Sequence, residues 1–225
     1  MTEAKDASKE KCNGGVPENM PIPYRQEVFR KLIHLSSLWI PAVIYLYQGQ
    51  KILLVYFFLT LLILNLLCEF AYSCQVPVIR EVYSFFFGRM LRNKQVKRGQ
   101  WVVSGAPPVF AAAALACLLF RPYFAAIGMV VMLTADTAAA LIGRRFGRHA
   151  CVNHKSVEGV AAFIVTGLVF SLLILWGSGI LSWKLGLGAV LGTVLAAGAE
   201  LFEKQLHVDD NLSIPVIMGA VLTLF

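Results

Sequence analysis

The chain is 225 residues long, 58% of them hydrophobic and 15% charged, with a mean hydropathy of +0.69 and a formal net charge of +7. Soluble globular domains are about half apolar and about a quarter charged, so this composition excludes that class and indicates a multi-pass membrane protein. Membrane topology and anionic headgroups account for the positive charge, and we expect no nucleic-acid partner.

The first 24 residues are polar, rich in Lys and Glu, and contain a Gly pair and three prolines. This composition is typical of a disordered cytosolic tail, and the stretch has no apolar core of the kind found in a cleavable signal peptide. We expect residues 25–225 to form one integral membrane domain.

Seven hydrophobic segments follow the tail, and they predict an all-α bundle of about seven transmembrane helices. The segments are Leu32–Tyr47, Ile52–Tyr72, Trp101–Phe120, Pro122–Ile142, Gly159–Trp176, Leu185–Phe202 and Leu212–Phe225. Between the second and the third, Val78–Leu91 alternates apolar with charged residues and predicts one amphipathic helix lying in the membrane interface.

The basic residues orient these segments. With the N-terminus in the cytosol, only Lys51, Arg121 and Lys184 of the 20 lysines and arginines fall outside. This bias follows the positive-inside rule. It predicts a bacterial inner-membrane or ER-type membrane protein whose unusual polar groups face the cytosol.

One carboxylate, Asp136, lies inside the fourth hydrophobic segment. A charge at the centre of a membrane helix costs roughly 2.5 to 3.5 kcal/mol on insertion scales, so it normally faces a partner or a polar cavity. Asp136 is therefore the first candidate functional residue.

A glycine-rich and basic loop comes directly after Asp136. Glycines let a ligand approach the backbone, basic side chains attract phosphate, and a serine ahead of a helix leaves free amides for an anion. The candidate phosphate-binding residues of this loop are Gly143, Arg144, Gly147, Lys155, Ser156 and Gly159. The same residues also fit a small-residue packing seam and an ordinary basic loop with a capping serine.

A polar stripe precedes the first segment, where Glu27, Arg30, Lys31 and His34 share one helical face. We expect Arg30 and Lys31 to bind phosphate, and His34 to act as a hydrogen-bond partner or base. The alternative is a surface ion pair with the histidine at the headgroups.

The last group of candidate residues could supply hard oxygen ligands for Mg²⁺. Asp210 and Asn211 stand before the seventh segment, and together with Asp136 and Glu158 they are the candidate metal ligands. Acids and amides at that position are also common helix caps. Glu69 and Glu200 are weaker candidates for the same pocket.

In order and spacing, these motifs resemble those of the membrane family of CTP-dependent lipid-alcohol kinases, which includes dolichol kinase, phytol kinase and the yeast-type diacylglycerol kinase, and which is related to phosphatidate cytidylyltransferases. The carriers are Arg30-Lys31-x-x-His34, Leu91-Arg92, Asp136-x-x-Ala139-x-x-x-Gly143-x-x-x-Gly147, Lys155-Ser156-x-Glu158-Gly159 and Asp210-Asn211-x-x-x-Pro215. The chain departs from the family at Gln95, near which an acidic residue is common.

The resemblance implies an enzyme that transfers the γ-phosphoryl group of CTP, or another nucleoside triphosphate, to the hydroxyl of a polyprenol, phytol-like or diacylglycerol lipid. The catalytic residues would be His34, Asp136, Lys155 and Glu158, with Mg²⁺ as cofactor. The alternatives are a phosphatidate cytidylyltransferase that makes CDP-diacylglycerol, and a transporter or scaffold in which Asp136 lines an ion path. The Asn153–Gly159 stretch lacks the proline of the cytidylyltransferase motif, which favours a kinase.

Overall fold

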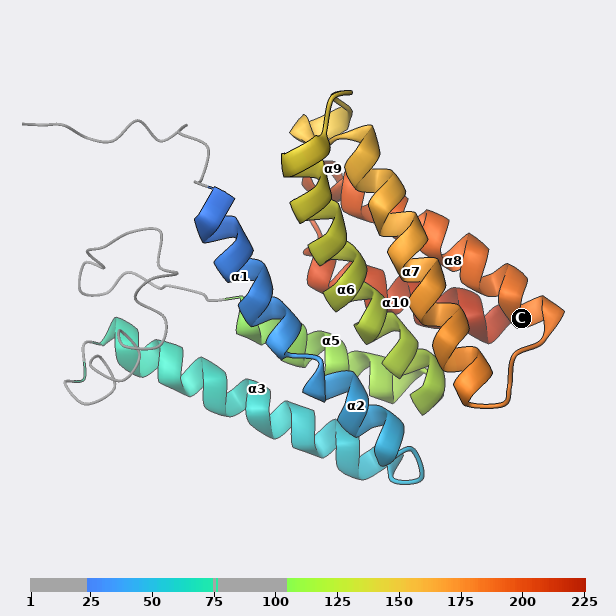
Figure 1. Cartoon of the computed structure of the whole chain (residues 1–225). Helices are drawn as coiled ribbons and strands as arrows, with labels where there is room; N and C mark the ends of the chain where they lie inside the picture. The colour runs from blue at the N-terminus through green and yellow to red at the C-terminus, as the bar shows by residue number, and fades with distance from the viewer. Residues whose placement is uncertain (1–23, 75, 77–104) are drawn as a thin grey trace, which may run out of the picture.

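A computed structural model of the protein describes residues 24–74, 76 and 105–225 (Figure 1). Over these residues the chain is helical, apart from turns and one isolated bridge between Ala150 and Ser156. The helices are α1 (Tyr24–Ser36), α2 (Trp39–Leu46), α3 (Lys51–Ser73), α5 (Ala106–Leu119), α6 (Pro122–Phe146), α7 (Val157–Gly177), α8 (Trp183–Leu201), α9 (Glu203–Leu206) and α10 (Asp210–Leu224), with a 3-10 turn at Val152–His154.

The expected all-α membrane architecture is confirmed. Four helices, α3, α6, α7 and α8, are long and apolar enough to cross a bilayer. α5 and α10 are apolar but have 14 and 15 residues. Such helices are roughly 21 to 22 Å long, against a hydrocarbon thickness of about 30 Å. The count of seven spans therefore stays a prediction, and Val78–Leu91 lies outside the described residues, as does the expected tail up to residue 23.

The first expected segment is two helices and not one, because the chain turns between α1 and α2. Pro41, in the first turn of α2, has no N–H, and its ring conflicts with a helical carbonyl four residues earlier. In the turn, the amides of Ser37 and Leu38 donate to the carbonyls of His34 and Leu35 instead. The break leaves α1 free to lie against α6 independently of α2.

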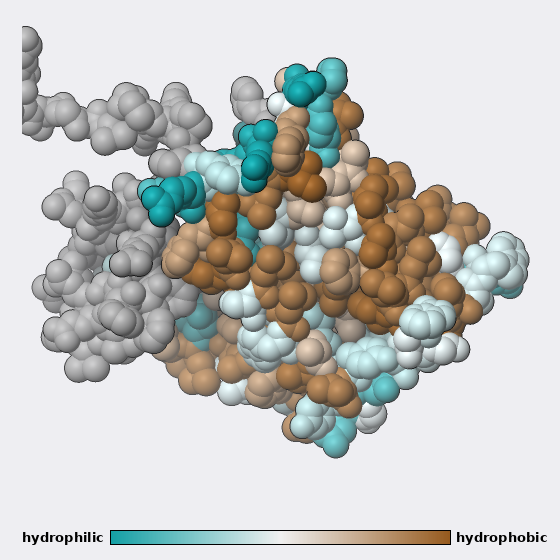
Figure 2. All heavy atoms as spheres, viewed as in Figure 1, coloured by the Kyte–Doolittle hydropathy of each residue, from teal (hydrophilic) through white to brown (hydrophobic). Residues whose placement is uncertain are grey.

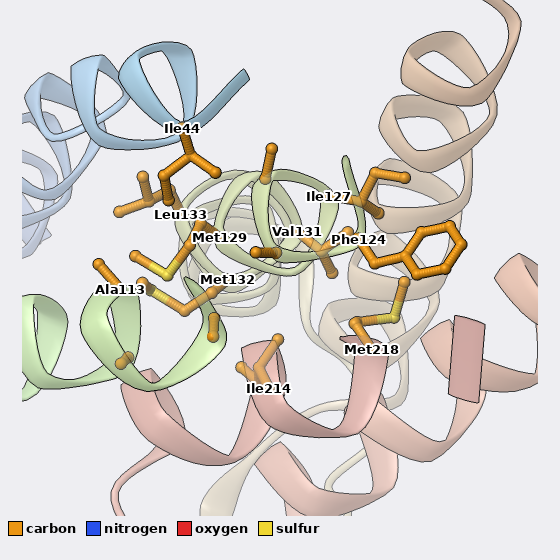
Figure 3. Close-up of a cluster of buried hydrophobic side chains, with 14 of the residues drawn as sticks. Ile44, Ala113, Phe124, Ile127, Met129, Val131, Met132, Leu133, Ile214 and Met218 are labelled. Carbon is orange, nitrogen blue, oxygen red and sulfur yellow. The ribbon is translucent and has the colours of Figure 1, made fainter. Parts of the chain in front are cut away.

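α6 is the centre of the bundle, with α7, α10, α2, α5 and α1 packed around it. Figure 3 shows its buried side chains meeting Ile44 of α2, Ala113 of α5, and Ile214 and Met218 of α10. Close contact with α10 depends on Gly128, where a Cβ would lie 2.8 Å from the carbonyl oxygen of Pro215. This packing holds the C-terminal half of α6, which carries Asp136, beside the N-terminal end of α10.

Apolar and hydrophilic residues lie on different parts of the molecular surface. In Figure 2 apolar side chains cover the flanks of the bundle, and the most hydrophilic ones gather chiefly where α6 ends and α7 begins. The three basic residues that we expect outside the cytosol all lie at the beginning of a helix. Lys51 begins α3, Arg121 is the N-cap of α6 and Lys184 lies in the first turn of α8. Arg121 is thus separated from the Arg144 end of α6 by nearly the whole helix, whose 25 residues extend roughly 37 Å.

Candidate active site

The helix ends at the hydrophilic side of the bundle enclose a cavity of about 450 Å³. Its walls come from α1, the C-terminal half of α6, the connection to α7, and the ends of α7, α8, α9 and α10. The lining residues are Arg30, Lys31, Asp136, Ala139, Ala140, Gly143, Arg144, Asn153, Lys155, Ser156, Gly159, Val160, Glu200, Glu203 and Asp210. Segments more than 100 residues apart in the sequence therefore build one polar site.

Asp136 is paired with a lysine of α1 that lies 105 residues earlier in the chain. Its Oδ2 accepts a hydrogen bond from Lys31 Nζ at 2.5 Å, and His34 Nε2 lies 3.5 Å from the same oxygen. The side chains of Lys31 and Asp136 are 3% and 9% exposed. A carboxylate this deeply buried needs a compensating cation, and α1 supplies it.

A second ion cluster joins α1 to the end of α6. Glu27 contacts Arg30 at 2.6 Å and Arg144 at 3.7 Å, and only 3% of its side chain is exposed. Burial disfavours the charged form of Glu27, but the hydrogen bond from Arg30 and the charges of Arg30 and Arg144 hold its pKa below the ordinary value. Glu27 is therefore ionised and anchors both arginines at the rim of the cavity.

On the opposite wall, Lys155 projects from the loop before α7 toward the end of α8. Its ammonium group donates to Glu200 Oε1 at 2.6 Å and to the Glu200 backbone carbonyl, and lies 3.8 Å from Glu203. Asn153, at a positive φ of 58°, donates to the Leu201 carbonyl at 2.9 Å and to Gln205 Oε1 at 2.7 Å. These contacts fix the loop against α8 and α9.

Small residues bring α6 and α7 together at the floor of the cavity. A Cβ on Gly143 would lie 2.9 Å from Ser156 Oγ, and one on Gly159 would lie 2.9 Å from the Ala139 carbonyl oxygen. Ser156 Oγ caps α7 by accepting from the Gly159 amide at 3.1 Å. The packing and capping alternatives are thus present in the structure. They are compatible with ligand binding because Gly143, Ser156 and Gly159 also line the cavity.

Most of the candidate residues come together, but some do not. Glu158 turns to the outside, where its carboxylate contacts His149 Nδ1 at 2.7 Å. Asn211 donates to Asp209 and Asp210 at the start of α10. Gly147, Asn211, Glu158, His34 and Glu69 are not among the cavity-lining residues. Their proposed roles remain predictions.

The sequence does not indicate the roles of three residues at the site. Glu27 belongs to the polar stripe, but its contact with Arg144 has no local signal, and nothing in the sequence marks Glu203 or Asn153 as site residues. Both of the latter belong to contacts between the loop before α7 and the α8–α9 end, about 50 residues later in the chain. No local pattern reports such a pairing.

The carboxylates of the cavity fit a magnesium ion that arrives with phosphate. Asp136, Glu200, Glu203 and Asp210 all line the cavity. Among the described residues, however, no three His, Cys, Asp or Glu side chains converge into a ready metal cage. Mg²⁺ is commonly held by one or two carboxylates together with substrate phosphates and water, so the donor set suits this mode.

Comparison with known proteins connects this site to a chemistry. The chain is 35% identical over 102 residues to phytol kinase of Synechocystis, a match that covers 42% of the chain and 41% of that protein. It is 26% identical over 235 residues to CTP-dependent diacylglycerol kinase 1 of Saccharomyces cerevisiae, covering 89% of the chain and 75% of the yeast protein. The chain is thus similar to two named lipid kinases, one of them CTP-dependent.

This likeness confirms the resemblance to lipid kinases that the sequence motifs indicate, whereas the expected relation to phosphatidate cytidylyltransferases stays a prediction. An uncharacterized protein of Rickettsia prowazekii is also similar, with 26% identity over 87% of the chain and 93% of its own length. No protein-family model and no solved structure matches the chain.

Proposed function

We propose that the protein is a membrane lipid kinase that transfers the γ-phosphoryl group of CTP, or of another nucleoside triphosphate, to the hydroxyl of a lipid alcohol. The observation that carries this proposal is the cavity, where buried Asp136 is paired with Lys31 of α1 and the other basic lining residues come from α1, the end of α6 and the loop before α7. The names of two relatives supply the reaction class. The acceptor would be a polyprenol, a phytol-like alcohol or diacylglycerol.

The basic residues would bind and orient the phosphates. Arg30, Lys31, Arg144 and Lys155 surround the cavity, and Ser156 begins a helix whose N-terminus favours anions. Phosphoryl transfer depends mainly on such positioning and charge stabilisation, so no covalent nucleophile is needed on the protein. Mg²⁺, held by Asp136 and Asp210, would neutralise the charge that develops on the phosphates.

The acceptor hydroxyl would lie near Asp136, on the side of α1. His34 Nε2 is 3.5 Å from Asp136 and makes no hydrogen bond in the described part of the chain. It could receive a hydrogen bond from the hydroxyl and orient it. The lipid chain would remain among the apolar helices.

The decisive experiment uses purified protein in nanodiscs with CTP and a panel of lipid alcohols. With CTP labelled at the γ-phosphate, we expect the label in the lipid fraction, and a parallel series with ATP measures nucleotide preference. With CTP labelled in cytidine and phosphatidate as acceptor, label in the lipid would instead identify a cytidylyltransferase. If no label were transferred in either arm, the result would contradict the enzyme proposal, and the transporter or scaffold alternative would remain.

We also propose that the cavity faces the cytosol, where nucleotide is made. Arg148 and Lys184 are exposed and lie near opposite ends of the bundle, before α7 and at the start of α8. Each would be replaced by cysteine in a cysteine-free background, so that both variants lose one positive charge. An impermeant maleimide on intact cells should label Lys184→Cys and leave Arg148→Cys unlabelled. The reverse pattern would place the cavity on the outer face of the membrane, away from cytosolic nucleotide, and would contradict the proposed orientation.

A further inference from the structure

Every lysine and arginine that lines the cavity already has a carboxylate partner. Arg30 and Arg144 contact Glu27, Lys155 contacts Glu200, and Lys31 contacts Asp136. A nucleoside triphosphate bound there must therefore compete with protein carboxylates for these cations. The question is which ion pair can open without leaving a buried charge uncompensated.

The Lys31–Asp136 pair differs from the others because its carboxylate is the one proposed to receive a cation. Lys155 is also held by the Glu200 backbone carbonyl, and both arginines share a glutamate at the cavity rim. Asp136, in contrast, would gain a divalent ion in exchange for an ammonium group. The buried carboxylate would stay compensated throughout.

Two cations on one oxygen of Asp136 would repel each other. Lys31 Nζ lies 2.5 Å from Asp136 Oδ2. Magnesium–oxygen distances are about 2.0 to 2.1 Å, so an ion on the same oxygen would stand within about 4.6 Å of a positive ammonium group in a buried setting. Binding of the ion to Asp136 therefore favours movement of Lys31.

We propose that Lys31 is an exchangeable partner of Asp136, which releases the carboxylate to a divalent cation only when phosphate oxygens are there to receive the ammonium group. This rests on the proposed function, in which the ligand is a metal-bound nucleoside triphosphate. The consequence is ordered loading: Lys31 excludes the metal alone and admits it together with the nucleotide. Lys31 is then a positioning residue as well as a phosphate ligand.

The test measures metal binding without turnover. Mn²⁺ serves as the probe, and the free ion is counted by its EPR signal in nanodisc preparations of the full chain with no nucleotide present. We expect Lys31→Met to bind Mn²⁺ at least about 10-fold more tightly than wild type, because the competing charge is gone. In the double variant Lys31→Met/Asp136→Asn the gain should disappear. Equal affinity in wild type and Lys31→Met, or a gain that persists in the double variant, would overturn the proposal.

A second measurement needs only the wild-type protein, in case Lys31→Met does not fold. Mn²⁺ alone should leave the thermal unfolding temperature unchanged, whereas Mn²⁺ with CTP should raise it. An equal rise with Mn²⁺ alone would show that the metal does not wait for phosphate. Neither measurement uses phosphate transfer, so a failed kinase assay would contradict the proposed function without deciding this exchange.

Discussion

α6 and α3 are both long apolar helices, yet their surroundings differ. In the most apolar stretch of α3 the mean hydropathy is 2.4 and 17% of the residues are buried. In that of α6 the mean hydropathy is 1.9 and 72% of the residues are buried. The less hydrophobic helix is therefore the more deeply packed. In a bilayer, lipid tails are as apolar as a protein core, so hydropathy does not mark which helix lies inside.

Small and polar residues mark the interior here. Buried positions of α6 include Gly128, Ala135, Asp136 and Thr137. α3, in contrast, exposes large side chains such as Leu67 along most of its length. Small residues let neighbouring helices approach α6, and its carboxylate can exist only where a partner meets it. The helix that departs furthest from uniform hydrophobicity is the one that carries the chemistry.

The largest expected effect comes from removing the charge of that central helix. Asp136→Asn keeps the shape but loses the carboxylate charge, so the phosphoryl-transfer rate should fall at least about 100-fold. The substitution also leaves Lys31 buried without its ion pair, so thermal stability should fall as well. Initial rates and unfolding temperatures in nanodiscs measure both effects.

Arg121→Gln is the matched control, because it removes a charge from the opposite end of α6. It should leave the transfer rate unchanged. Near-normal turnover of Asp136→Asn would remove Asp136 from the metal site.

The next effect concerns close packing. Gly128→Ala puts a methyl group 2.8 and 2.9 Å from the Pro215 carbonyl oxygen and Cα, and backbone cannot move aside as a side chain can. We expect a loss of about 1 to 3 kcal/mol in unfolding free energy, measured by denaturant titration in detergent. Gly186→Ala, on α8, adds the same methyl group where nothing lies within 4 Å, and should change stability by less than about 0.5 kcal/mol. Equal losses would mean that α6 is not tightly packed against α10.

The comparison also explains what could be read from the sequence. The apolar segments, Asp136 and the basic residues around it are local signals, so the membrane fold and most of the cavity were predictable. The turn before Pro41 shows that an apolar run does not determine how many helices it forms. Glu158 shows a second limit, because consecutive helical residues point about 100° apart. Its neighbour Gly159 faces the cavity while Glu158 contacts His149.

A smaller effect is expected for the wall opposite α1. A charge-assisted hydrogen bond is worth about 1.5 to 3 kcal/mol. Because Lys155→Ala removes only one of several cations, we expect an effect at the lower end of this range, a fall of roughly 10-fold in kcat/KM for the nucleotide. Lys184→Ala, at the far end of the bundle, should have no effect. Steady-state kinetics with varied CTP measures both variants. If the two changed kcat/KM equally, the loop before α7 would not bind the nucleotide.

The smallest effect is expected for α1. This helix buries charged residues and exposes apolar ones, which is the reverse of an amphipathic helix in a soluble protein. Its buried residues are Glu27 and Lys31, whereas Phe29 and Leu32 are 43% and 58% exposed. Charged pairs, such as that of Lys31 with Asp136, therefore hold α1 to α6. Glu27→Gln should lower the unfolding free energy by about 1 kcal/mol or less at pH 7, because Arg30 is largely exposed and the pair is screened.

The pH dependence of that difference has a definite sign. The pKa of Glu27 is held below its ordinary value of 4.5, so the stability it contributes is fully present above pH 4.5 and is lost as the pH falls through the folded-state pKa. Unfolding temperatures of wild type and Glu27→Gln should therefore differ at pH 7 and converge under more acidic conditions. Arg25→Gln, which removes an exposed charge from α1, should show no such convergence. A Glu27→Gln difference that is independent of pH would mean that packing, and not charge, holds α1 against the central helix.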